Sequence, residues 1–94
     1  IYPEEVEAVV NNQPYVQESV VVDRASKLVA LVYLDQEALR KDGLDQEEVS
    51  DLPERIRINS DRQLPNYSQI AKVEIVDQPF EKTPKMSIKR FLYK

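Results

Sequence analysis

The longest apolar run of this sequence is Leu28-Val29-Ala30-Leu31-Val32-Tyr33-Leu34. The run has the length of a β-strand, and no polar residue interrupts it. A strand that is apolar on both faces is buried on both, which happens inside a sheet and not at its edge. The run therefore predicts the central strand of a small sheet.

Two further strands are predicted beside it. Residues 16–22 are rich in β-branched side chains, and the polar connection at residues 23–27 is short enough for a hairpin. We therefore expect residues 16–22 and 28–34 to pair antiparallel. Residues 71–76 alternate between apolar and polar for most of their length, which is typical of a half-buried strand.

The first predicted helix covers residues 3–10. It opens with a proline and three glutamates, which suit the first turn of a helix and its positive N-terminal end. Val6 and Val9, with Val10, form an apolar stripe at helical spacing. Ala71, Val73 and Ile75 form one face of the strand predicted at residues 71–76. We expect the valine stripe of the helix to pack against this face.

Other helical segments are predicted further along the chain. Residues 36–40 and 44–49 each predict a helical turn, and the cap residues Ser50 and Asp51 predict a longer helix that ends near residue 63. A last helix is predicted from the spacing of Ile88, Phe91 and Leu92. The sequence thus predicts an α+β fold, a single domain over residues 1–94 in which helices pack on a sheet of about three strands.

The composition excludes several kinds of site. The chain has no Cys, no His and one Gly. Thiolate nucleophiles, zinc sites built on Cys or His, a Ser–His–Asp triad and a glycine-rich phosphate loop are therefore excluded. The net charge of −4 argues against a dedicated nucleic-acid binder, because phosphate contacts need a basic excess. No apolar run approaches the ~20 residues of a membrane span, and the lack of Cys fits a cytoplasmic origin.

The basic residues gather towards one end of the chain. Five of them lie between Lys82 and Lys94, whereas residues 35–54 are mostly acidic. This asymmetry favours either a partner for the basic end or a cationic last turn that complements a helix dipole.

Two motifs at the ends of the chain carry a resemblance to a known family. They are Ile1-Tyr2-Pro3-Glu4-Glu5-Val6-Glu7 and Lys82-Thr83-Pro84-Lys85-Met86-Ser87-Ile88-Lys89-Arg90. The first resembles the Ile-x-Pro-x-Glu-Val-Glu helix opening, and the second the Thr-Pro-x-Gly-Lys-Ile-x-Arg motif, of AMP-forming acyl-CoA synthetases. Residues 64–67 and 75–77 also look like the approach to that last motif. The resemblance covers essentially the whole chain and implies the C-terminal lid domain of adenylate-forming enzymes.

The resemblance implies a role within a larger enzyme. Such enzymes use ATP and Mg²⁺ to convert a carboxylic acid into an acyl-adenylate, and the lid then rotates so that CoA can form the thioester. The endings at residues 80–84 and 89–92 look most like the branch acting on long-chain fatty acids. The ATP, Mg²⁺ and acyl sites would belong to an N-terminal adenylation domain absent from this chain, so we expect the chain alone to be inactive. The full-length protein is expected in the cytoplasm, with a peripheral position at the membrane as an open alternative.

The chain departs from the family pattern at the position of greatest chemical importance. Ser87 stands where the resemblance places the catalytic lysine, and Met86 where it places glycine. A neutral hydroxyl cannot supply the lysine's charge, so one alternative is that Lys85 or Lys89 substitutes for it. Residues 85, 87 and 89 share one side of an extended loop, whereas in a helix Lys85 and Lys89 share a face without Ser87. The other alternative is a parent enzyme that adenylates slowly or mainly serves the thioester step.

Two different kinds of function remain alternatives to the synthetase lid. The chain could be a stand-alone interaction or regulatory module that uses its basic C-terminal end as the contact surface. It could also be the equivalent domain of a peptide-synthetase adenylation unit, which serves a carrier protein instead of CoA. The residues that precede Ile1 and follow Lys94 in the gene would separate these alternatives.

Overall fold

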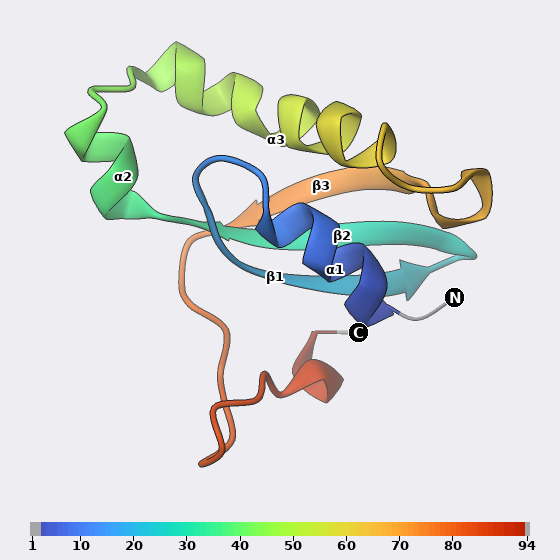
Figure 1. Cartoon of the computed structure of the whole chain (residues 1–94). Coiled ribbons are helices and arrows are strands. Elements are labelled where there is room, and N and C mark those ends of the chain that lie inside the picture. Colours follow the sequence, from blue (N-terminus) through green and yellow to red (C-terminus); the bar gives the residue numbers. More distant parts are fainter. Residues whose placement is uncertain (1–2, 94) are drawn as a thin grey trace.

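The computed structural model of the chain describes residues 3–93 and is built on one three-stranded sheet (Figure 1). Its strands are β1 (Val16–Arg24), β2 (Lys27–Leu34) and β3 (Ile70–Val76), in the order β1-β2-β3. β1 and β2 pair antiparallel, and β2 and β3 pair parallel. The apolar run of β2 therefore occupies the centre of the sheet, which confirms the first prediction.

The hairpin between β1 and β2 closes through two residues in the left-handed region. Ala25 has a φ of 53° and Ser26 a φ of 65°. Positive φ at both central residues is the feature of a type I′ turn, whose twist matches that of the two strands. The predicted antiparallel hairpin is confirmed, with Arg24 opposite Lys27 at its closed end.

One face of the sheet is covered by helices. The three helices are α1 (Pro3–Asn11), α2 (Gln36–Lys41) and α3 (Gln46–Asp61). α1 and α3 pack against the sheet, as Figure 1 shows for α3 above it. The core on this face includes Val6, Val10, Val21, Ala30, Val32, Leu34, Leu52, Ile56, Ile70 and Val73. We call this core and its helices the helix layer.

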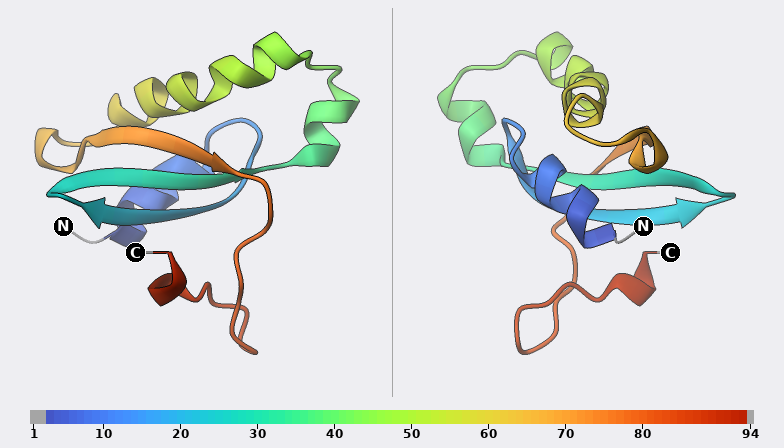
Figure 2. Two further views of the ribbon diagram at one scale, coloured as in Figure 1. Left: turned by 180° about the vertical axis from the view of Figure 1, so that it is seen from behind. Right: turned by 45° about the vertical axis from the view of Figure 1, so that its right-hand side comes forward.

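The opposite face of the sheet is covered by the last part of the chain. Residues 77–93 run below the sheet in Figure 1 and contain only the short 3₁₀ turn η2 (Arg90–Leu92) as regular helix. Both views of Figure 2 show this segment separated by the sheet from α3. The smaller core here consists of Val20, Val22, Val29, Leu31 and Phe80. We call residues 77–93 the C-terminal segment.

The long helix differs from its prediction. α3 begins at Gln46 and runs without a break through Pro53, whereas the sequence predicted a turn at residues 44–49 and a new helix from residue 50. The true N-cap is Asp45, which accepts a hydrogen bond from the Glu48 amide at 2.8 Å in a capping box. Pro53 costs one helical hydrogen bond, and the burial of Leu52 and Ile56 against the core offsets that cost.

The inward-facing side of β3 also differs in part. Ile70 and Val73 are buried, but Ala71 and Ile75 are exposed. The pairing with β2 shifts between Leu28 and Val29, so Ala71 is skipped and lies between the two buried residues Ile70 and Val73. Val73 shares the helix-layer core with Val6 as predicted, whereas Ile75 lies outside that core and Val9 is only half-buried.

The predicted C-terminal helix is wrong. The chain forms a single 3₁₀ turn at Arg90–Leu92, and Phe91 is 69% exposed. Ile88, by contrast, packs on the core of the C-terminal segment. So short a helix gains little from its own hydrogen bonds, and the side chains of Arg90 and Tyr93 fix the chain instead through hydrogen bonds with Glu7 and Glu81.

The fold is the predicted α+β arrangement of three strands with helices packed on them. Ile1 and Tyr2 of the first motif lie outside the described residues, as does Lys94. Within residues 3–93, no helix is long and apolar enough to cross a membrane.

Candidate functional site

The second motif forms a tight hairpin at the far end of the C-terminal segment. The Thr83 amide donates to the Ser87 carbonyl at 2.8 Å, and the Met86 amide donates to the Thr83 carbonyl at 2.8 Å. A bridge between Lys82 and Ile88 forms the base. We call residues 82–89 the motif loop. Residues 84–86 form the turn, and Figure 1 shows the motif loop reaching away from the sheet.

Met86 adopts a backbone conformation that normally requires glycine. Its φ is 67°, and its side chain is 74% exposed. A three-residue hairpin loop commonly ends in such a left-handed residue, and a side chain there costs about 1–2 kcal/mol. This geometry gives a physical reason for the glycine that the family pattern has at this position. The loop therefore keeps the glycine-type conformation without the glycine.

The structure places the three predicted site residues on this loop, but in neither predicted geometry. Lys85 lies at the tip of the turn, while Ser87 and Lys89 lie on the returning arm. The left-handed Met86 interrupts the alternation between residues 85 and 87. Ile88 turns into the core of the C-terminal segment, so Ser87 and Lys89 share the opposite side of the returning arm. Ser87 and Lys89 therefore lie on one arm of the hairpin, and Lys85 lies at its tip.

The polar side-chain atoms of these residues have no hydrogen-bond or ion-pair partner among residues 3–93. Among the hydrogen bonds and ion pairs of residues 3–93, none involves Ser87 Oγ, Lys85 Nζ or Lys89 Nζ. The Lys89 amide donates to the Glu81 carbonyl at 2.8 Å, which fixes the backbone from which this lysine extends. The motif loop therefore presents two ammonium groups and a hydroxyl that the rest of the described chain does not bind.

A third lysine at the loop is already neutralised. Lys82 pairs with Glu18 of β1, and its Nζ also donates to the Phe80 carbonyl at 3.2 Å. Glu18 Oε2 accepts from the Phe80 amide at 3.3 Å as well. With its charge engaged at the base, Lys82 anchors the outgoing arm of the motif loop to the sheet.

A second anchor joins the two ends of the C-terminal segment. The ring of Tyr93 packs edge-on against that of Phe80, with 4.9 Å between the ring centroids. The Tyr93 hydroxyl accepts a hydrogen bond from the Glu81 amide at 2.7 Å. Phe80 is 3% exposed, so this aromatic pair seals the small core beneath the sheet.

A third anchor brings the two sequence motifs together. Arg90 donates to both carboxylate oxygens of Glu7, a residue of α1 that is 6% exposed. Glu7 Oε2 also accepts from the Val21 amide of β1 at 2.7 Å. The hydrogen bonds that Arg90 donates to Glu7 raise the pKa of the Arg90 guanidinium above its ordinary value, against the opposing effect of desolvation. The glutamates of α1 also suit the helix dipole, so their position in the sequence does not predict this pair.

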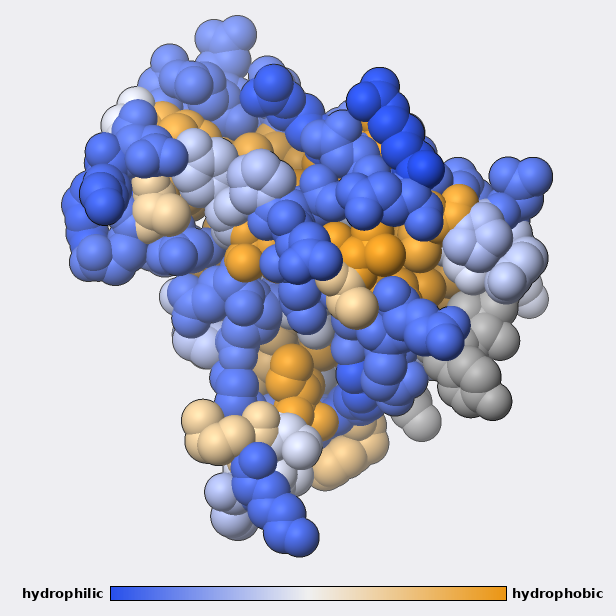
Figure 3. Space-filling model, viewed as in Figure 1, coloured by the Kyte–Doolittle hydropathy of each residue, from blue (hydrophilic) through white to orange (hydrophobic). Residues whose placement is uncertain are grey.

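The surface shows where the domain is less completely covered. On the face in Figure 3, hydrophilic side chains form most of the outline. Apolar atoms are visible in the recess between α1 and α3, and again beside the C-terminal segment below the sheet. Apolar side chains thus reach the surface beside both layers of the domain.

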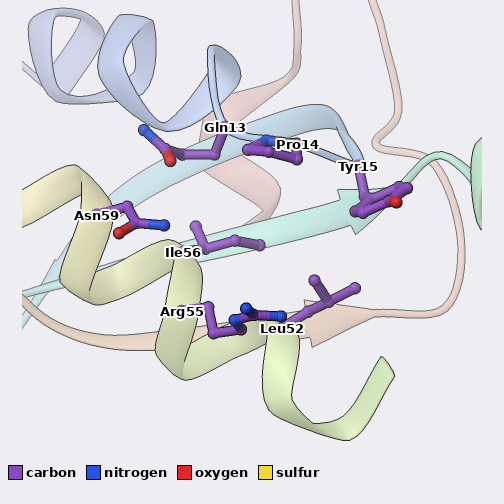
Figure 4. A pocket seen from close by; sticks show the side chains of 7 residues that line it. All are labelled: Gln13, Pro14, Tyr15, Leu52, Arg55, Ile56 and Asn59. Carbon is purple, nitrogen blue, oxygen red and sulfur yellow. The ribbon is translucent and has the colours of Figure 1, made fainter. Parts of the chain in front are cut away.

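A separate hollow lies between α3 and the turn after α1 (Figure 4). It measures about 190 Å³ and is lined by Gln13, Pro14, Tyr15, Leu52, Arg55, Ile56 and Asn59. None of these residues belongs to the motif loop. The mixture of apolar and amide side chains is that of a helix packed on a turn, and the volume is below that of an ordinary ligand pocket.

Comparisons with known proteins place the chain in a family. The profile described as AMP-binding enzyme C-terminal domain matches residues 5–86. The matched span contains α1 from Glu5 onward and ends one residue before Ser87. No curated protein sequence matches this chain.

Several solved structures contain a similar domain. A Brucella canis acyl-CoA synthetase is 27% identical with a TM-score of 0.75, over 98% of this chain and 16% of that chain. A benzoate CoA ligase from Burkholderia xenovorans LB400 is 27% identical with a TM-score of 0.71, over 98% of this chain and 18% of that chain. A Mycobacterium tuberculosis fatty acyl CoA synthetase shares the fold at 20% identity and a TM-score of 0.67, over 97% of this chain and 16% of that chain.

This chain thus spans between 16% and 18% of the length of these structures. The matched residues include all three strands and all three α-helices except the first two residues of α1. This chain belongs to the AMP-binding enzyme C-terminal domain family.

Proposed function

We propose that this chain is the mobile C-terminal lid of an ATP-dependent, AMP-forming acyl-CoA ligase of the cytoplasm. In this proposal it partners an N-terminal adenylation domain of the same polypeptide, which holds ATP, Mg²⁺ and the acyl group. The family match over residues 5–86 carries the proposal. The exposed motif loop supports it, because a lid needs polar groups that its own domain leaves free.

The reaction has two half-reactions. In the first, the carboxylate of the acid attacks the α-phosphate of ATP, and pyrophosphate leaves to give the acyl-adenylate. In the second, the thiolate sulfur of CoA attacks the acyl carbonyl carbon, and AMP leaves with the electron pair of the broken bond. The lid closes over the site for the first step and rotates for the second.

Within this proposal the motif loop serves the first half-reaction, with Lys89 as the cation. Negative charge that develops around the α-phosphate is stabilised by a positioned ammonium donor. Lys89 shares the returning arm with Ser87, and its backbone is held by the bond to Glu81. Lys85, at the turn tip beyond Met86, lacks both features. The geometry therefore favours Lys89 over Lys85 as the substitute for the family lysine.

The acyl substrate is proposed to be a long-chain fatty acid. The resemblance of residues 80–84 and 89–92 to the long-chain branch supports this choice. The acceptor is proposed to be CoA, since the two more similar structures above are called an acyl-CoA synthetase and a CoA ligase. The alternative acceptor is a carrier protein. A carrier domain encoded after Lys94 in the gene would favour this alternative over CoA.

The test measures the two half-reactions separately in the full-length parent. Lys89→Ala is expected to slow pyrophosphate release by about 10²–10³-fold, the usual effect of removing one such donor. Thioester formation from preformed acyl-adenylate should change far less. Lys85→Ala is the matched control, since it removes the same charge from the same loop, and it should change pyrophosphate release by less than about threefold.

Ser87→Lys tests the other alternative. If no lysine substitutes, both alanine variants should be near normal and Ser87→Lys should accelerate pyrophosphate release. If none of the three changes alters that release beyond about twofold, the motif loop is not catalytic and the proposed role is wrong.

The isolated chain is proposed to fold without turnover. An assay of AMP release from fatty acid, ATP and CoA should give only background with the 94-residue chain. Saturable AMP release by the purified chain would contradict a division of labour between lid and adenylation domain.

A further inference from the structure

The pair formed by Glu7 and Arg90 links residues that are 83 positions apart in the sequence. Glu7 is on α1, near the N-terminal end of the chain, and Arg90 immediately follows the motif loop. Both carboxylate oxygens and two guanidinium nitrogens take part, which is the bidentate arrangement. Such a pair fixes orientation as well as distance.

Glu7 is constrained on a second side. The Val21 amide donates to Glu7 Oε2 at 2.7 Å. β1 lies at an edge of the sheet, so some of its amides point away from β2 and need another acceptor. Because Glu7 is 6% exposed, its charge requires a partner, and Arg90 supplies it. One carboxylate thus joins α1, β1 and the C-terminal segment.

The other anchors of the motif loop reach different elements. Lys82 binds Glu18 of β1, and Tyr93 binds Glu81 within the C-terminal segment itself. Among the hydrogen bonds and ion pairs of residues 3–93, those that tie the C-terminal segment to α1 all come from Arg90. The orientation of the returning arm relative to α1 therefore depends on this residue.

We propose that Glu7 and Arg90 form a clamp that holds the motif loop in a fixed orientation to α1, with Arg90 as a positioning residue for Lys89 and Ser87. Arg90 follows Lys89 directly, and its amide donates to the Ile88 carbonyl at 2.9 Å. A guanidinium held at one end of this short stretch limits how far the arm can swing. The lid body and its loop then move as one unit. The catalytic part of this inference rests on the proposed function.

The first experiment measures amide hydrogen exchange in the 94-residue chain. Glu7→Gln keeps an oxygen for the Val21 amide and removes the charge that Arg90 needs. It should speed exchange of the Met86 and Lys89 amides about ten- to hundredfold, because the loop opens more often without the charged pair. The buried Val32 amide of β2 should exchange at its normal rate.

Glu4→Gln is the matched control. Glu4 lies on the same helix, and its Oε1 is 4.0 Å from Arg90 Nε with the side chain 65% exposed. An exposed pair at this distance contributes little, so loop exchange should change by less than about twofold. Arg90→Lys provides a second variant, which keeps the charge and loses the bidentate fork. The exchange rate of its loop amides should lie between the rates of Glu7→Gln and of the unchanged chain.

The second experiment measures both half-reactions in the full-length parent. Misplacing the loop should slow pyrophosphate release by up to about 10²-fold in Glu7→Gln, with thioester formation from acyl-adenylate within about twofold. Equal loss in both half-reactions would mean that the pair only stabilises the domain, and this would overturn the proposal. Unchanged exchange of the loop amides would overturn it as well.

The two proposals fail in different ways. If Lys89→Ala leaves pyrophosphate release normal, the proposed catalytic role fails, while loop exchange still decides whether the clamp exists. The other case is that Lys89→Ala slows pyrophosphate release, whereas Glu7→Gln speeds exchange of the loop amides and leaves pyrophosphate release normal. The clamp then exists, but it does not position the loop for catalysis, and the positioning role is overturned.

Discussion

The two faces of this sheet are covered in different ways. The helix layer buries a continuous apolar core beneath regular helices. The C-terminal segment covers the other face with an almost irregular chain that is held by single contacts, Lys82 with Glu18, Phe80 with Tyr93 and Arg90 with Glu7. Non-directional packing stabilises the first layer, whereas directional pairs orient the second.

The helix layer therefore stabilises the domain, whereas the C-terminal segment holds the motif loop. Regular helices give a rigid body, and the loop that carries the predicted site residues lies on the layer with the smaller core. Segments with few apolar contacts open at lower free energy than the body of a domain. We therefore expect substitutions in the helix layer to unfold the domain, and substitutions in the C-terminal segment to release the motif loop first.

The largest effect is expected from Leu34→Ala. Leu34 is 1% exposed at the end of the central strand and packs in the helix-layer core. Its truncation should lower the free energy of unfolding by about 4 kcal/mol, in the upper part of the range for buried leucines, because rigid elements surround the cavity. Urea denaturation measures this. Tyr67→Ala is the control, since Tyr67 is 74% exposed and its loss should cost less than about 0.5 kcal/mol.

Phe80→Ala should have a smaller effect on global unfolding, although a larger side chain is removed. Phe80 is 3% exposed, but its neighbours in the C-terminal segment can move into the space. We expect about 3 kcal/mol, the lower end for a buried phenylalanine. Exchange of the Met86 amide should rise before the domain unfolds. If Phe80→Ala costs as much as Leu34→Ala and the loop amides stay protected, the two layers form one cooperative unit.

The sequence predicted the helix layer better than the C-terminal segment for a physical reason. The apolar run of β2 and the valine stripe of α1 are periodic patterns, and burial converts such patterns directly into structure. The boundary of α3 was wrong because Pro53 has a strong local preference that tertiary packing overrode. The skipped residue in β3 has no periodic signal at all.

The candidate site was predictable only in its location. The resemblance pointed to Lys85, Ser87 and Lys89, and the structure places all three on one exposed loop. Their roles stay predictions. Methionine itself gives no sign of a left-handed backbone, so the turn at Met86 had only one signal in the sequence, the glycine that the resemblance places at this position. The partnership of Glu7 with Arg90 was equally hidden, since no pattern within one element pairs residues so distant in sequence.

A smaller effect is expected from the cap of α3. Asp45→Ala removes the acceptor for the Glu48 amide, and should cost about 1 kcal/mol of unfolding free energy. Asp51→Ala is the control, because the sequence predicted a cap near that residue whereas it lies inside the helix and is exposed. It should cost less than about 0.5 kcal/mol. If Asp51→Ala lowers the free energy of unfolding more than Asp45→Ala does, the helix begins near residue 50, as the sequence predicted. Neither change should alter exchange of the motif-loop amides.

The smallest effect, of opposite sign, is expected from Met86→Gly. Met86 has a φ of 67° and a side chain that is 74% exposed, so its removal loses no packing. Relief of the left-handed conformation gains about 1–2 kcal/mol, and the extra freedom of glycine in the unfolded chain takes back about 0.5–1 kcal/mol. The net gain should be about 0.5 kcal/mol, measured by urea denaturation and by slower exchange of the amide at residue 86.

Tyr15→Gly is the matched change in the helix layer. Tyr15 has a similar φ of 68°, but its ring packs on the core and its hydroxyl donates to Asp42 Oδ2 at 2.6 Å. The same relief of strain should be outweighed by lost burial, giving a net loss of about 1 kcal/mol. Because the backbone strain is alike, opposite signs would show that the helix layer keeps a strained residue for its packing. Gains of equal size in both variants would remove the distinction between the two layers at the level of single residues.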